Sequence, residues 1–121
     1  AVRTVAEYID PPLYIDALAG SVEAAYAKLD HRPDVLVASY HGMPKRYLTE
    51  GDPYHCQCQK TTRLLRERLG WDAGMIDTSF QSVSRNKNHI RNTPITSPSI
   101  ICIFFFTAGK GLSILGGNVP S

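Results

Sequence analysis

DVLVASYHGMP, residues 34–44, is the stretch that decides the expected fold of this chain. Its first five residues form a short apolar and β-branched run, a pattern typical of a buried strand, and the strand is expected to extend to Tyr40. Gly42 and Pro44 then interrupt regular structure. His41 is therefore predicted at the exit of a strand into a loop, where open α/β sheets bind their ligands. Its position alone leaves open a structural histidine whose ring nitrogens bond to backbone groups.

Helical and extended patterns alternate on either side of this strand. A stretch with the helical period of apolar residues follows Pro11 and Pro12. Proline suits the first turn of a helix, so a helix is predicted to begin there. The apolar residues of that stretch are Ile15, Leu18, Val22, Ala25, Tyr26 and Leu29. His31-Arg32-Pro33 is expected to stop this helix, and a loop is expected from His41 to Asp52 after the strand.

A second helix is predicted after the loop, with Asp52 as N-cap and Pro53 in the first helical position. It is expected to run to about Leu69, facing Leu64 and Leu65 inward, and to end at Gly70. Residues 74–80 are predicted as a second strand. The order helix, strand, helix, strand predicts an α/β fold with a parallel sheet.

Composition narrows the class of protein. A chain of 121 residues is one small domain or a piece of a larger one. Its 43% hydrophobic and 20% charged residues are typical of a soluble globular protein, and a net charge of +2 is too small to favour nucleic acid as a partner. No secretory signal is visible, and the longest apolar run, residues 100–106, is too short to span a bilayer. A cytoplasmic location is the expectation.

The three cysteines argue against a disulfide framework and favour a reduced compartment. Cys56 and Cys58 are separated by one residue, which is not the C-x₂-C spacing of a zinc site. Together with His55 they leave open a metal site or an iron–sulfur cluster. The alternative is that these residue types have no metal-binding role here.

The chain changes character near residue 83. Residues 1–82 hold all 11 acidic residues, whereas residues 83–121 hold four basic residues and no acidic one. The run from Ile100 to Phe106 is apolar, uncharged and free of proline, which is the pattern of a sticky β segment unless it is buried. It is either a core strand or a segment that does not belong to the preceding domain. We expect residues 1–82 to form an α/β domain and residues 83–121 to be a foreign or frame-shifted, poorly ordered tail.

Residues 39–61, SYHGMPKRYLTEGDPYHCQCQKT, resemble the catalytic segment of bacterial ferrochelatase. That enzyme inserts ferrous iron into protoporphyrin in the last step of haem synthesis. The resemblance extends from about Arg3 to Ser82 and includes H-G-M-P, G-D-P-Y and the closing S-F-Q-S. It implies a fragment of a Rossmann-like chelatase domain, with a C-terminal tail, residues 83–121, that does not match the family.

The resemblance assigns the chemistry to His41, which matches the family's histidine. Two roles are assigned to that histidine in the family, ligand of the iron and acceptor of pyrrole protons, and the sequence does not choose between them for His41. An imidazole suits both roles, because it titrates near neutral pH and binds first-row metals.

Five neighbours of His41 are candidate substrate contacts, each with an alternative. Tyr40, Met43 and Pro44 would shape the porphyrin wall or pack the end of the strand. Lys45 and Arg46 would pair with the porphyrin propionates or be solvated loop charges. The G-D-P-Y residues are expected to build the start of the helix rather than to touch substrate.

Protoporphyrin and ferrous iron are the substrates that the resemblance implies, with no resident cofactor firmly implied. It also implies peripheral contact of the intact enzyme with the inner membrane. The family's first domain, and the glutamate that faces the catalytic histidine, have no counterpart in this sequence, so an incomplete copy is expected. The alternatives are a non-catalytic fragment that binds porphyrin or metal, and an inactive truncated product.

Overall fold

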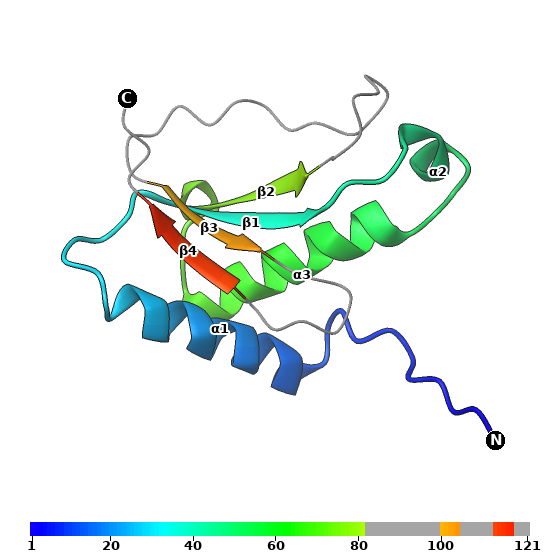
Figure 1. The fold of residues 1–121 in the computed structure, drawn as a ribbon, viewed down its shortest axis with the longest axis horizontal. Coiled ribbons are helices and arrows are strands. Elements are labelled where there is room, and N and C mark those ends of the chain that lie inside the picture. Colours follow the sequence, from blue (N-terminus) through cyan, green and yellow to red (C-terminus); the bar gives the residue numbers. More distant parts are fainter. Residues whose placement is uncertain (82–99, 105–112, 118–121) are drawn as a thin grey trace.

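A sheet flanked by helices makes up the described part of the chain. The computed structural model describes residues 1–81, 100–104 and 113–117, with side chains described as far as residue 80. The elements are α1 (Pro12–Tyr26), β1 (Val35–His41), α2 (Lys45–Thr49), α3 (Tyr54–Leu69), the 3₁₀ turn η1 (Ala73–Met75), β2 (Ile76–Gln81), β3 (Ile100–Phe104) and β4 (Ser113–Gly117). Figure 1 shows the strands side by side, with α1 and α3 packed along them.

Strand β1 has a neighbour on each side, because the strand order is β2-β1-β3-β4. It runs parallel to β2, with Leu36 opposite Ile76 and His41 opposite Gln81, and also parallel to β3. The predicted α/β fold and its parallel strand pair are therefore confirmed. Strand β4 runs antiparallel to β3, so the sheet is mixed rather than purely parallel.

The apolar run of the tail takes part in this sheet. Its first five residues form β3, and Val35 of β1 lies opposite Ile100. The sequence left open whether this run is a core strand or a segment foreign to the domain. The pairing with β1 matches the first alternative, and it gives the backbone groups of β3 hydrogen-bonding partners. The tail residues other than β3 and β4 lie outside the described residues, and the domain boundary at residue 82 stays a prediction.

Both predicted helices exist, with small differences at their ends. Helix α1 ends at Tyr26 rather than near Leu29, because Lys28 and Leu29 donate backbone hydrogen bonds to residues three positions earlier. Helix α3 begins at Tyr54, one residue later than predicted, so Pro53 rather than Asp52 occupies the N-cap position. The helix ends as expected at Gly70, whose φ is +68°. No helix among the described residues is long and apolar enough to cross a membrane.

Two segments differ from the prediction. The expected loop between His41 and Asp52 contains the short helix α2, whose five residues are too few to show a helical period. The second strand begins at Ile76 instead of Gly74, because Ala73–Met75 form a 3₁₀ turn. Neither difference moves His41 from the end of β1.

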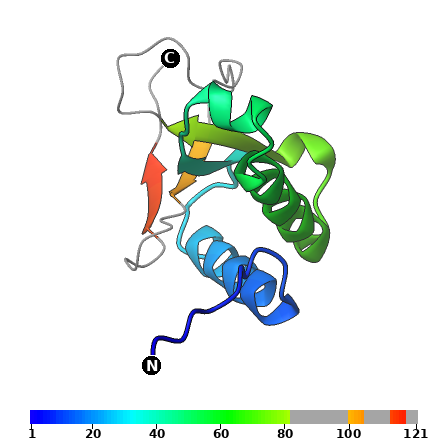
Figure 2. The ribbon, with the colours of Figure 1, turned by 90° about the vertical axis from the view of Figure 1, so that its right-hand side faces the viewer.

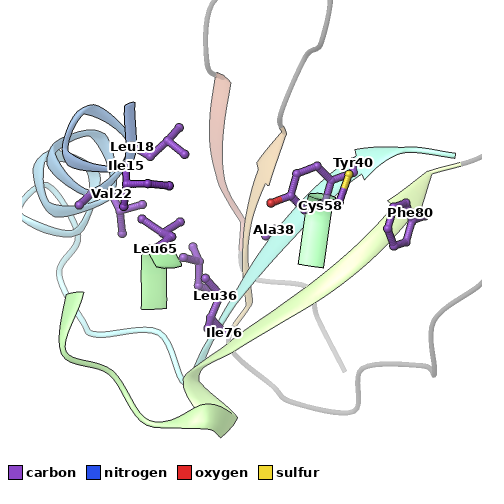
Figure 3. Packing of buried hydrophobic residues seen from close by; sticks show 11 residues of the cluster. Ile15, Leu18, Val22, Leu36, Ala38, Tyr40, Cys58, Leu65, Ile76 and Phe80 are labelled. Carbon is purple, nitrogen blue, oxygen red and sulfur yellow. The ribbon is translucent and has the colours of Figure 1, made fainter. Parts of the chain in front are cut away.

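The core lies between the helices and one face of the sheet. Helices α1 and α3 lie on the same side of the strands (Figures 1 and 2). Figure 3 shows Ile15, Leu18 and Val22 of α1 gathered near Leu65 of α3 and Leu36 of β1. Leu36, Leu65 and Val22 are the largest fully buried side chains, so the centre of this cluster is where β1, α3 and α1 meet.

We expect Leu65→Ala to lower the free energy of unfolding by about 2–5 kcal/mol, because it leaves a cavity in place of a fully buried side chain. Leu13→Ala is the matched control, since Leu13 is 83% exposed on α1 and its loss is expected to change stability by at most about 0.5 kcal/mol. Denaturant unfolding followed by circular dichroism measures both. Equal effects of the two substitutions would contradict the described core.

Candidate active site

His41 is the last residue of β1 and is exposed. Successive side chains of a strand point to opposite faces, and Ala38 and Tyr40 belong to the cluster that faces the helices. Val37 is buried yet lies outside that cluster, as expected for the other face. The His41 imidazole therefore leaves the carboxyl end of the sheet on the face turned away from α1 and α3. Its predicted place at a strand exit is confirmed, and its predicted chemistry stays a prediction.

Tyr40 points the other way, into the core. It is 5% exposed, and its Oη lies 2.9 Å from Oγ1 of Thr62 on α3. Burial raises the pKa of the Tyr40 phenol, so the group stays neutral in its apolar surroundings. The structure thus places Tyr40 where it packs the strand end, which was the alternative to a porphyrin contact; the contact itself stays a prediction.

Met43 and Pro44 lie in a small hollow beside the strand end. The hollow is lined by Met43, Pro44, Tyr47, Leu48, Asp52, Tyr54, His55 and Phe80. Its volume of about 10 Å³ holds roughly one water molecule, so its side chains are nearly in contact. The fold therefore brings Met43 and Pro44 onto the G-D-P-Y turn, whereas His41 is not among the lining residues.

The G-D-P-Y turn builds the start of α3, as predicted. Gly51 has a φ of +93°, a value that glycine adopts without strain. Asp52 Oδ1 accepts a hydrogen bond of 2.9 Å from the Tyr54 backbone N–H, which satisfies one free donor at the helix start.

Tyr54 also contacts the His41 backbone, a link that sequence reasoning missed. Its Oη donates a hydrogen bond of 3.0 Å to the His41 carbonyl oxygen. Burial raises the pKa of Tyr54, so the phenol remains a donor at neutral pH. The two residues are thirteen positions apart, and no periodic pattern connects them. The spacing between H-G-M-P and G-D-P-Y was the one feature of the sequence that could have indicated this contact.

Aromatic rings support the same corner of the sheet. The Tyr54 ring lies edge-on to Phe80, with centroids 6.4 Å apart, and the His55 ring stacks on Phe80 at 5.1 Å. These rings place the first turn of α3 against the end of β2. His55 is thus engaged in packing rather than aligned with the two cysteines.

Cys56 is exposed and Cys58 is buried, so the two thiols lie in different environments. Within the part of the chain that the structure describes, no three histidine, cysteine or acidic side chains gather in a way that could hold a metal ion. His55 and the two cysteines, which the sequence left open as a metal site, do not form such a group among the described residues.

Lys45 and Arg46 are exposed on α2. Arg46 Nη2 donates to the Tyr47 hydroxyl at 3.3 Å, and its guanidinium carbon lies 5.0 Å from the centre of that ring. Arg46 is therefore oriented by Tyr47 at the rim of the hollow. Pairing of either cation with a porphyrin propionate stays a prediction.

We expect the two helical thiols to differ in reactivity. Burial raises the pKa of Cys58 to about 11, so at pH 8 only about one molecule in a thousand carries its thiolate. Brief iodoacetamide treatment at pH 8, followed by peptide mass mapping, should label the exposed Cys56 and spare Cys58. Labelling of both thiols should appear once urea unfolds the chain. Equal labelling in the native state would contradict the burial of Cys58.

Comparison with known proteins gives this arrangement a family. The family model described as Ferrochelatase matches residues 1–93, which extends past the predicted boundary at residue 82. The chain is 70% identical over 91 residues to the ferrochelatase of Rhodobacter capsulatus, covering 75% of this chain and 26% of that protein. It is 58% identical over 82 residues to the ferrochelatase of Allorhizobium ampelinum, and 56% identical over 82 residues to that of Rhizobium meliloti. Each of these two matches covers 68% of this chain and 24% of the relative.

The chain thus spans about a quarter of the length of the curated relatives that it matches. The matched part includes β1, α3 and β2, and with them His41 and the hollow beside it. On the strength of this match, the chain belongs to the ferrochelatase family.

Proposed function

We propose that this chain is the histidine-bearing segment of an enzyme that inserts ferrous iron into protoporphyrin, with His41 as its catalytic residue. The exposed position of His41 at the end of the central strand carries the proposal. A side chain there is fixed at its base by the sheet yet free to meet a ligand. Family membership supports the choice of reaction, because the matched residues include the H-G-M-P stretch.

The reaction needs a group such as this imidazole. When Fe²⁺ enters the macrocycle, the four pyrrole nitrogens bind it and two N–H protons leave, so the ring gains one metal ion and loses two protons. A neutral imidazole nitrogen has a lone pair that either binds the incoming metal or accepts a leaving proton. Because His41 is exposed, a proton that it accepts has a route to solvent.

The neighbours of His41 support a role in holding the substrate. Met43 and Pro44 offer partly buried apolar surface next to the strand end, whereas Lys45 and Arg46 offer positive charge. A porphyrin has an apolar ring with carboxylate side chains, which matches this division. The hollow of about 10 Å³ is far too small for a porphyrin. This small volume favours a segment of a larger enzyme over the alternative, a fragment that binds porphyrin by itself.

His41→Ala is expected to lower the rate of iron insertion at least about 100-fold, because it removes the group that binds the metal or takes the proton. The test grafts residues 1–82 into the matching region of Rhodobacter capsulatus ferrochelatase, to which this chain is 70% identical over 91 residues. Anaerobic insertion of Fe²⁺ into protoporphyrin, followed by absorbance, gives the rate.

His31→Ala in the same chimera is the matched control, since His31 is exposed in the turn before β1 and far from the strand end along the chain. Its rate should stay within about twofold of the unsubstituted chimera. Retention of activity in the His41→Ala chimera would refute the proposed role of His41.

A further inference from the structure

We propose that Tyr54 is a positioning residue for His41, which orients the imidazole by holding the carbonyl group of the same residue. This inference rests on the proposed function of His41. It is based on the hydrogen bond of 3.0 Å that Tyr54 Oη, in the first turn of α3, donates to the carbonyl oxygen of His41 at the end of β1.

Holding this carbonyl constrains the histidine side chain. The peptide group between His41 and Gly42 is planar, so a bond to its oxygen fixes the rotation of that plane about the His41 Cα. His41 is the last strand residue, and the chain leaves the sheet after it. A fixed plane at this point keeps the Cα–Cβ direction of His41 constant, and an imidazole must lie within a few tenths of an ångström of its reacting atom to work well.

Tyr54 is itself held firmly enough for this task. Asp52 accepts a hydrogen bond from its backbone N–H at 2.9 Å, and the edge of its ring packs against Phe80. The phenol is thus anchored through its backbone and its ring before its hydroxyl reaches His41.

The Tyr40 phenol makes a similar link between β1 and α3 and can be compared with Tyr54. Tyr40 also joins β1 to α3, through its hydrogen bond of 2.9 Å with Thr62, but this bond lies in the core and ends on a threonine. Both bonds contribute to the attachment of the helix to the strand. The Tyr54 bond differs because its acceptor belongs to His41. Loss of either bond should reduce stability, whereas loss of the Tyr54 bond should also reduce catalysis.

The test is Tyr54→Phe in the active chimera described above, which removes one hydroxyl and keeps the ring. We expect kcat to fall about tenfold while KM for protoporphyrin stays within about twofold, because the apolar surface is unchanged and the imidazole is misaligned. Thermal unfolding of the same samples measures the structural contribution separately.

Thr62→Val is the matched control, because it removes the partner of the other phenol without touching His41. It should lower the melting temperature by at least as much as Tyr54→Phe and leave kcat within about twofold. An unchanged kcat in Tyr54→Phe, or an equal loss in Thr62→Val, would overturn the inference. Activity retained by His41→Ala would instead overturn the proposed function.

Asp52→Ala keeps the inference testable if Tyr54→Phe does not fold. It removes the hydrogen bond that fixes the Tyr54 backbone and leaves the phenol in place. We expect a smaller loss of kcat, about threefold, with an unchanged KM. An unchanged kcat in this variant would also overturn the inference.

Discussion

Burial of the helix-facing side of β1 is the constraint on which the rest of the described structure depends. Leu36 and Ala38 are fully buried, and Leu65 of α3 is fully buried among the same cluster of side chains. Because side chains alternate along a strand, this burial sends Tyr40 into the core and His41 to the opposite face. A shift of one residue would turn the histidine toward the helices and the tyrosine toward the opposite face, at the cost of the apolar cluster. The hydrophobic pattern of β1 therefore determines which of these two side chains lies in the core.

The end of the strand needs a second means of support, because it lies beyond the centre of the core. The first turn of α3 provides it, through the Tyr54 hydroxyl on the His41 carbonyl and through two rings on Phe80. The H-G-M-P and G-D-P-Y stretches thus form one unit, in which the second supports the first from the helix side.

Much of this could be predicted from the sequence, because strong local patterns produced it. The strand before His41 is a continuous apolar run, and α1 and α3 show helical periods with proline and glycine at their ends. Helix α2 could not be predicted, since five residues carry no period, and neither could β4, whose Gly116 and Gly117 favour turns. The bond between Tyr54 and His41 depends on tertiary packing. The chemistry of His41 came from the family resemblance rather than from any local pattern.

We propose that the register of β1 delivers the His41 imidazole to a bound porphyrin, whether as iron ligand or as proton acceptor. A crystal structure of the active chimera with protoporphyrin bound tests it most directly. We predict an imidazole nitrogen within about 3.5 Å of the pyrrole nitrogens or of a metal ion above them. A porphyrin bound elsewhere, with the His41 side chain facing solvent, would contradict the account.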